Sequence, residues 1–113
     1  MKKIEAIIRP QTVEDVKNAL AEIGISGMTL TEVRGFGNQK GFVDHFRVSE
    51  IYVSLLPKME IKIIVKDDQV EQVVQTIIEA AHTGEVGDGK IFILDLLECV
   101  RVRTGEAGSM AIG

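Results

Sequence analysis

IEAIIRPQTVEDV (residues 4–16) has a second copy half a chain later, IKIIVKDDQVEQV (residues 61–73). In one constant register Ile4 aligns with Ile61, Arg9 aligns with Lys66, and VEDV aligns with VEQV. Each copy is a short apolar run followed by apolar residues at spacings of three and four, which predicts a strand and then an amphipathic helix. The chain is therefore predicted to consist of two similar halves.

The two predicted helices carry apolar stripes and end signals. Thr12 with Asp15 predicts a capping box before the first helix, and Gly24 stands where a glycine ends it. Asp67 or Asp68 is the predicted N-cap of the second helix. The stripes are Val13, Val16, Ala19, Leu20 and Ile23 in the first helix and Val70, Val73, Val74, Ile77, Ile78 and Ala81 in the second.

Another strand-like run follows each helix, MTLTEVRGF at residues 28–36 and KIFILDLL at residues 90–97. The order βαββαβ predicts an α+β fold, the ferredoxin-like split βαβ arrangement, with a four-stranded antiparallel sheet and two helices on one face. Residues 1–113 are one domain's worth of chain.

The last predicted strand is apolar on both sides. Alternation directs Ile91, Ile93 and Leu97 to one face of the sheet, and Phe92, Leu94 and Leu96 to the other. Helices cover only one face of such a sheet. We therefore hypothesise that a homo-oligomer covers the other by packing sheet on sheet.

Composition narrows the class of protein. Hydrophobic residues make up 45% and charged residues 27%, which is typical of a globular domain and not of a disordered one. No apolar run has the length of a membrane span, and MKKIEAIIRP is too short and too charged for a signal peptide. Cys99 is the sole cysteine, which indicates a reducing, cytoplasmic setting and argues against a cysteine-based zinc site. The net charge of −4 disfavours general affinity for nucleic acid.

The segment between the second and third strands, GNQKGFVDHFRVSEIYVSLL (residues 37–56), is too long for an ordinary hairpin loop. It holds two of the four phenylalanines, the only tyrosine and one of the two histidines. So much apolar surface in a long loop favours a partner-binding element. A loop folded onto its own domain is the alternative.

Three glycines in TGEVGDGK (residues 83–90) precede the last strand and end on Lys90. Arg101 and Arg103 alternate, so in an extended chain both project to one face. If the terminal extended stretch lies near the end of the last strand, three cations could converge beside backbone N–H groups of the turn at residues 84–89, which is the chemistry that a triphosphate needs. The alternative is a turn and an edge strand with three solvated charges, and the spacing alone leaves both interpretations open.

Common nucleotide motifs do not match. GEVGDGK lacks the Walker A glycine spacing, and Ile91 stands where a Ser or Thr would hold magnesium. GFGNQKG (residues 35–41) misses the dinucleotide fingerprint because its third glycine comes one residue late and it opens a loop.

Two other classes remain as alternatives. RGFG (residues 34–37) resembles half of an RNA-recognition motif, but the first and third strands carry no aromatic residue on which bases could stack. No catalytic constellation is present, although His45 could serve as a phosphoryl acceptor in a small kinase.

Together these motifs resemble the P-II family of nitrogen-regulatory signal proteins. The matching stretches are MKKIEAIIRP, TEVRGFG.QKG, LPK, TGEVGDGKIF and VRVRTGE, which span nearly the whole chain. The resemblance implies a non-catalytic homotrimer that binds ATP or ADP in clefts between protomers. It also implies 2-oxoglutarate binding, together with Mg-ATP, at the base of the T-loop, residues 37–56. Residues 82–90 correspond to the nucleotide-binding B-loop and residues 102–113 to the C-terminal loop.

The resemblance also implies targets and a place of action. The T-loop would dock on an ammonium transporter or on an enzyme of nitrogen metabolism. The protein would be cytoplasmic, would bind no nucleic acid and would reach a membrane only through a transporter.

Site residues follow from the same resemblance. A keto acid that chelates a metal bridging the phosphates would bind cooperatively with the nucleotide, and Gln39 is the implied metal contact. The ATP or ADP contacts implied are Thr29, Gly37, Asn38, Gln39, Lys62, Ile64, Gly87, Asp88, Gly89, Lys90, Arg101, Val102 and Arg103. The 2-oxoglutarate contacts implied are Gln39, Lys40, Gly41, Lys58 and Gly87.

Several positions depart from the family pattern. Asn38 replaces an arginine near the terminal phosphate, and Lys62 replaces a glutamate that faces the nucleoside, so nucleotide affinity or preference is open to change. Ile51 replaces the tyrosine that some members have uridylylated, and Tyr52 lies one residue on, so this modification is not expected. Ser49 resembles a serine that is phosphorylated in certain members, with a solvated loop serine as the alternative.

Overall fold

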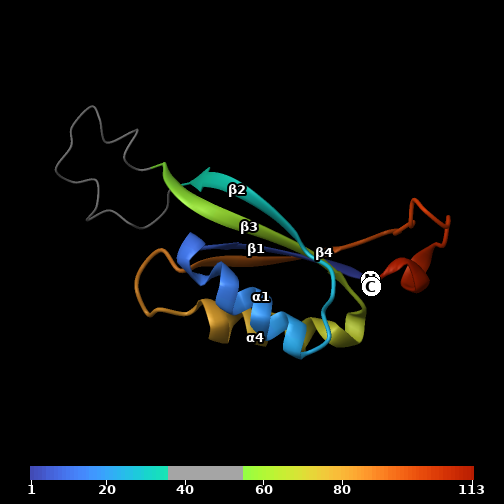
Figure 1. Ribbon diagram of the computed structural model, residues 1–113, viewed down its shortest axis with the longest axis horizontal. Helices are drawn as coiled ribbons and strands as arrows, with labels where there is room; N and C mark the ends of the chain where they lie inside the picture. The colour runs from blue at the N-terminus through green and yellow to red at the C-terminus, as the bar shows by residue number, and fades with distance from the viewer. Residues whose placement is uncertain (36–54) are drawn as a thin grey trace.

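The structure, a computed structural model, describes residues 1–35 and 55–113 (Figure 1). Its elements follow the predicted order βαββαβ, which confirms the ferredoxin-like split βαβ fold. The strands and helices are β1 (Lys2–Ile8), α1 (Val13–Glu22), β2 (Thr29–Gly35), β3 (Leu56–Val65), α4 (Val70–Ala81) and β4 (Gly89–Asp95). Short 3-10 turns lie at Pro10–Thr12, Asp67–Gln69 and Gly108–Ala111.

The four strands form one antiparallel sheet in the order β2-β3-β1-β4. In this register Ile4 lies opposite Ile63 on one side and opposite Ile93 on the other. Both helices lie against the same face of the sheet, and no helix of residues 1–35 and 55–113 lies on the other face (Figure 1). The sheet therefore has a helix-covered face and an open face.

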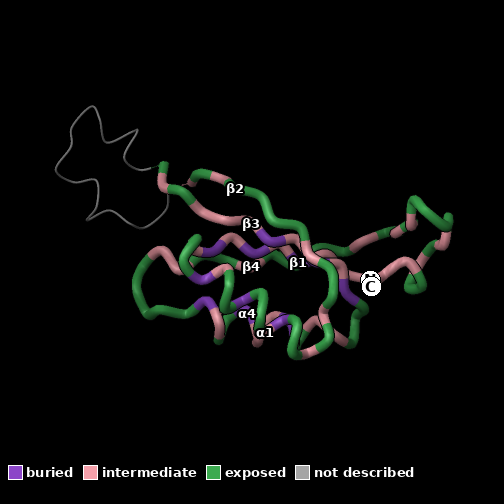
Figure 2. The backbone as a smooth tube through the Cα atoms, viewed as in Figure 1, coloured by how far each residue is buried: buried purple, intermediate pink, exposed green. Residues whose placement is uncertain are grey.

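The core lies between the helices and the two central strands. Figure 2 shows buried backbone on α1, α4, β1 and β3, while β2 and β4 at the edges are largely exposed. The predicted stripes supply the helical half of the core, except that Ile78 is exposed. The buried apolar residues are Ile4, Ala6, Ile8, Val16, Leu20, Ile61, Ile63, Val65, Val73, Ile77 and Ala81.

The C-terminal signal of α1 is confirmed. Gly24 has a φ of +89°, its N–H donates to the oxygen of Ala21 at 3.0 Å, and the N–H of Ile25 donates to the oxygen of Leu20 at 3.0 Å. This pair of bonds is the Schellman motif, in which glycine is favoured because of the positive φ. The chain then turns toward β2.

The predicted N-terminal caps are wrong. The Thr12 hydroxyl donates to the oxygen of Arg9 at 2.9 Å and makes no cap bond, because a 3-10 turn already precedes α1. Asp67 likewise lies in a 3-10 turn, where its carboxylate pairs with the Met1 amino group at 2.8 Å. Because a 3-10 turn precedes each helix, the extended cap residues are Arg9 and Lys66, one turn earlier than predicted.

The last strand is shorter than predicted. β4 ends at Asp95, opposite Lys2, and residues 96–113 leave the sheet as an arm, orange to red at the right of Figure 1. Leu97 is 96% exposed on this arm. The predicted T-loop, residues 37–56, includes the first residue of β3, and the predicted B-loop, residues 82–90, includes the first two residues of β4.

The open face retains apolar surface. Phe92 and Leu94 lie on it at 44% and 42% exposure, beside the charged residues of β1. In the part of the chain that the structure describes, neither helix is long and apolar enough to cross a bilayer.

Candidate functional site

The glycine-rich loop, residues 82–88, joins α4 to β4 and lies where β1 ends. Gly84, Gly87 and Gly89 all have a positive φ, between 89° and 117°. Gly87 is the third residue of a turn, the position at which a type II turn calls for glycine. The three glycines are therefore required by the backbone path of the loop.

Asp88 organises this loop from within. One carboxylate oxygen accepts the N–H groups of Thr83 at 2.8 Å and Gly84 at 3.0 Å. The other accepts the Thr83 hydroxyl and the Arg9 Nε–H, the latter at 3.1 Å. The bonds from Thr83, followed by those from Arg9 and Gly84, hold the pKa of Asp88 well below its usual range. Its carboxylate is thus directed into the loop, although Asp88 was predicted as a nucleotide contact.

We expect Asp88→Asn to destabilise the fold at neutral pH and to do so less in acid. A carboxyl whose pKa is depressed in the folded state stabilises it above the unfolded pKa of about 4, and that contribution is lost as the pH falls toward the folded value. The stability difference between wild type and variant should thus be constant from about pH 5 to 7 and shrink below about pH 4. Urea unfolding across this range measures it.

The control for this prediction is Glu14→Gln on α1. Glu14 makes an exposed pair with Lys17 at 3.1 Å, which contributes little to stability. An Asp88→Asn difference of equal size at pH 2.5 and pH 7 would contradict the role assigned to the carboxylate.

Two cations lie behind the loop. Arg9, directly after β1, donates from Nη2 to the Val86 oxygen at 2.8 Å in addition to its bond to Asp88. Lys58 of β3 donates to the Gly87 oxygen at 2.7 Å. Burial, followed by the charge of Arg9, lowers the pKa of Lys58. The predicted neighbours Lys58 and Gly87 are therefore brought together.

Arg9 is the residue that the sequence-based site prediction missed. Its position after an apolar run was visible, but its contact with residues 86–88 depends on β1 pairing with β4. Only that pairing places Arg9 beside Asp88, far away in the chain.

The loop also offers hydrogen-bond donors. Within the described residues, no oxygen accepts the backbone N–H groups of Val86 and Gly87. Lys90 follows at the start of β4, exposed and on the open face, since it lies opposite Ile7. Free N–H groups at a glycine turn beside a lysine are suited to bind an anion such as phosphate.

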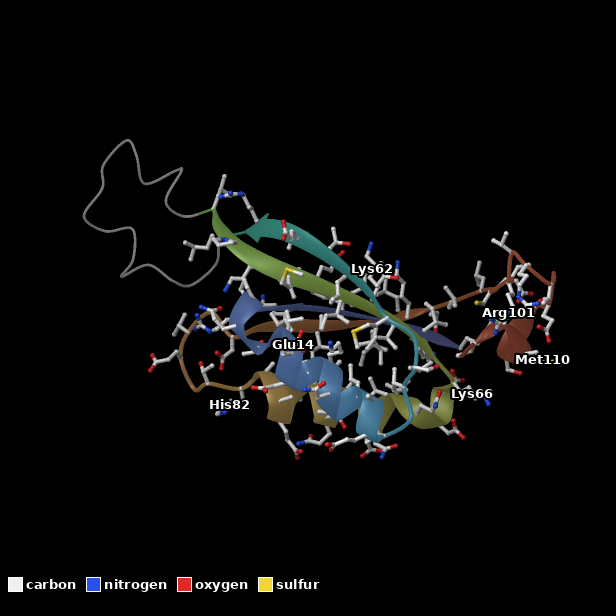
Figure 3. All side chains as sticks on the ribbon, viewed as in Figure 1. Glu14, Lys62, Lys66, His82, Arg101 and Met110 are labelled. Atoms are coloured by element: carbon white, nitrogen blue, oxygen red, sulfur yellow. The ribbon has the colours of Figure 1, made fainter. Side chains whose placement is uncertain are left out.

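A second group of predicted residues lines a cavity of about 450 Å³ beside the α1–β2 connection. Thr29, Lys62 and Ile64 line it together with the end of the arm, Ala111–Gly113. Lys62, marked in Figure 3, pairs with Glu60 at 3.3 Å and lies opposite Glu5. The charge that Lys62 brings is therefore balanced locally.

The predicted arginines lie on the arm. Arg101 donates from Nη2 to the oxygens of Ala111 at 3.4 Å and Gly113 at 3.2 Å, and its Nε lies 3.6 Å from a Glu106 carboxylate oxygen. Val102 and Arg103 are exposed. Arg101 thus fixes the path of the arm, whereas Arg103 projects from it.

The convergence of Lys90 with Arg101 and Arg103, which the spacing left open, does not occur within one chain. The glycine loop lies at the beginning of β4 and the arm at its end, so the strand separates them by about 20 Å. In Figure 3, His82 at the start of the loop and Arg101 on the arm lie at opposite ends of the molecule. Each protomer therefore carries a loop end and an arm end.

Several predicted site residues lie outside the described residues, namely Gly37, Asn38, Gln39, Lys40, Gly41 and Ser49. Among residues 1–35 and 55–113, no group of three His, Cys, Asp or Glu side chains could hold a metal ion. The predicted metal contact, Gln39, lies outside these described residues.

Comparison with known proteins identifies the family. The sequence model of the family described as Nitrogen regulatory protein P-II matches residues 1–106. The chain belongs to the P-II family. It is 54% identical over 112 residues to Nitrogen regulatory protein P-II 1 of Escherichia coli (strain K12), covering 99% of this chain and 100% of that protein. It is 52% identical over 112 residues to Nitrogen regulatory protein P-II of Pasteurella multocida (strain Pm70), with the same coverage.

Solved structures give the same result. The crystal structure of Arabidopsis thaliana PII bound to citrate matches with a TM-score of 0.81 and 46% identity, covering 97% of this chain and 90% of that one. The predicted P-II family membership is confirmed. The P-II chain is thus a regulator of nitrogen metabolism and not an enzyme, as predicted.

Proposed function

We propose that this P-II protein binds ATP or ADP, and 2-oxoglutarate with Mg²⁺, and controls its targets through residues 37–56. The glycine loop carries the proposal. It presents Lys90 and two N–H groups that have no acceptor among the described residues, the arrangement that a phosphate chain needs. Gly87, Gly89 and Lys90 are the proposed phosphate contacts.

The nucleotide site is proposed to lie between protomers of a homotrimer. One protomer would supply Lys90 and its glycine loop, and the neighbour would supply Arg103 with the cavity of Thr29, Lys62 and Ile64. The separation of the loop end from the arm end supports this arrangement, because one chain alone cannot close the site. The exposed apolar residues Leu97 and Phe92 support it as well.

The 2-oxoglutarate site is proposed beside the nucleotide, with Lys58 pairing a carboxylate of the keto acid. The residues present fit this ligand, since Lys58 lies at the glycine loop with its amine 2.7 Å from the Gly87 oxygen. Gln39 would hold Mg²⁺, which would bridge the two anions. That a plant relative is bound to citrate supports binding of a carboxylate-bearing ligand by this fold.

The remaining assignments follow from the family. The proposed partner is an ammonium transporter or an enzyme of nitrogen metabolism in the cytoplasm, with the membrane reached only through the transporter. Ser49 is a proposed modification site.

Selection of another adenine nucleotide remains the second candidate function, because Lys62 places an ammonium group in the proposed nucleoside cavity.

Lys90→Ala and Arg103→Ala should each weaken ATP binding by roughly 1.5–3 kcal/mol, as expected for a lost hydrogen bond between charged groups. Calorimetric titration measures the loss, and titrations with ADP, AMP and cyclic AMP test the nucleotide preference. Lys17→Ala on the exposed surface of α1 is the control. Unchanged affinity in both variants would contradict the site.

A mixing experiment tests whether the site is shared. When the two variants are unfolded together and refolded, a site built from adjacent chains regains wild-type affinity wherever an intact Lys90 meets an intact Arg103. Random mixing in a closed ring makes about a quarter of the sites intact. A site within one chain would regain none.

A further inference from the structure

Arg9 holds the glycine loop at two points. Its Nε–H donates to Asp88 at 3.1 Å, and its Nη2–H donates to the Val86 oxygen at 2.8 Å. Both side chains of the ion pair are largely buried, at 21% and 24% exposure. Because Arg9 follows β1 directly, these contacts tie the loop to the central part of the sheet.

Together with Lys58, Arg9 determines which backbone groups of the loop face away from the two cations. The oxygens of Val86 and Gly87 are bonded to the two cations behind the loop. Across a trans peptide the C=O and the following N–H point in opposite directions, so the N–H groups of Gly87 and Asp88 are turned away from the two cations. The Gly87 N–H has no acceptor within the described residues. A carbonyl oxygen directed at a phosphate would repel it. Holding both oxygens toward Arg9 and Lys58 therefore prepares the loop to bind an anion.

We propose that Arg9 is a positioning residue for the phosphate-binding loop. It acts through Asp88 and Val86, holds Gly87–Lys90 in the binding conformation and does not contact the nucleotide. The inference rests on the proposed nucleotide function. A guanidinium can bond two acceptors at once with a fixed geometry, which a lysine amine cannot reproduce.

The competing role for Arg9 is direct contact with a phosphate, and Asp88→Asn separates the two. If Arg9 binds phosphate directly, Asp88 competes for the guanidinium, and removing its charge should tighten ATP binding. If Arg9 positions the loop through Asp88, the same substitution should weaken ATP binding. Because Asp88 also holds the loop through Thr83 and Gly84, weaker binding in Asp88→Asn is read together with the double variant, in which a positioning role of Arg9 adds no further loss.

The experiment compares wild type with Arg9→Met, Arg9→Lys, Asp88→Asn and the Arg9→Met/Asp88→Asn double variant. ATP affinity is measured by calorimetry, and amide hydrogen exchange of residues 83–88 is measured without ligand. We expect Arg9→Met and Asp88→Asn each to weaken ATP binding about tenfold or more, and the double variant to lose no more than the worse single one. Arg9→Lys should recover only part of the loss, and loop amides should exchange faster in every variant.

Lys17→Met is the matched control, since it removes one positive charge from the exposed surface of α1. Wild-type ATP affinity in Arg9→Met, tighter binding in Asp88→Asn, or full rescue by Arg9→Lys would overturn the inference. If wild-type protein itself binds no ATP, the proposed function fails. Loop amide exchange then decides the inference separately, because unchanged exchange in Arg9→Met would show that Arg9 does not order the loop.

Discussion

Gly89→Ala should lower the free energy of unfolding by at least about 3 kcal/mol. A Cβ at this position would lie 1.7 Å from the Ile7 oxygen and 2.8 Å from the Ile7 carbonyl carbon, with Gly89 at a φ of +117°. Ile7 belongs to β1, a central strand paired on both sides, so its backbone cannot move aside without breaking sheet hydrogen bonds. Urea unfolding of wild type and variant measures the change, provided that the free energy of unfolding falls with urea concentration at a similar slope in both.

Gly84→Ala is the matched control for this prediction. Gly84 has a similar φ of +89°, but a Cβ there would meet nothing closer than the His82 Cε1 atom at 3.8 Å. Its substitution should cost only the strain of a positive φ, about 1–2 kcal/mol. If the two alanine variants unfold at the same urea concentration, the clash with Ile7 is not the reason that residue 89 is glycine.

The topology of this protein could be predicted from its sequence because the decisive signals are local. The repeat of strand and helix periods in residues 4–16 and 61–73 is present in the sequence itself, and Gly24 carries its own backbone preference. Thr12 and Asp67 failed as caps because each found another partner, the Arg9 oxygen and the Met1 amino group. Cap prediction assumes that a polar side chain has no competing partner.

The site was only partly predictable, for a geometric reason. The residues of the glycine loop are consecutive, so their association did not depend on the tertiary fold. Arg9 and Lys58 reach the loop only because β1 and β3 bring their ends beside it. The spacing of Lys90 and Arg103 in the sequence could not decide whether they converge, because that depends on the length of β4, which places the two at opposite ends of the sheet.

The distance between Lys90 and the two arginines gives Arg101 and Arg103 different roles. Arg101 bonds three residues of its own arm, so its immediate role is to shape the arm that presents Arg103. In the proposed site, a neighbouring protomer would bring Arg103 to a glycine loop. Assembly and nucleotide binding should therefore depend on each other in this protein.

Lys58→Met should reduce 2-oxoglutarate binding, measured with Mg-ATP present, by roughly 10- to 100-fold, the loss expected for a hydrogen bond between charged groups. Arg9 already bonds Asp88, whereas within residues 1–35 and 55–113 the Lys58 amine bonds a backbone oxygen and no carboxylate, so it can turn to a ligand carboxylate. Methionine retains the length and apolar stem of lysine and removes the charge. ATP affinity without 2-oxoglutarate should fall less, because the loop loses a single bond to a backbone oxygen while Arg9 still holds Asp88 and Val86.

Calorimetry with each ligand separates these effects, and Lys58→Arg tests the charge alone. The arginine variant should keep most of the 2-oxoglutarate affinity, while Lys17→Met should resemble wild type. Wild-type 2-oxoglutarate affinity in Lys58→Met would remove Lys58 from the site. Equal losses for ATP and 2-oxoglutarate would instead show that Lys58 acts by supporting the Gly87 oxygen, since a loop that has lost this support would bind both anions less well.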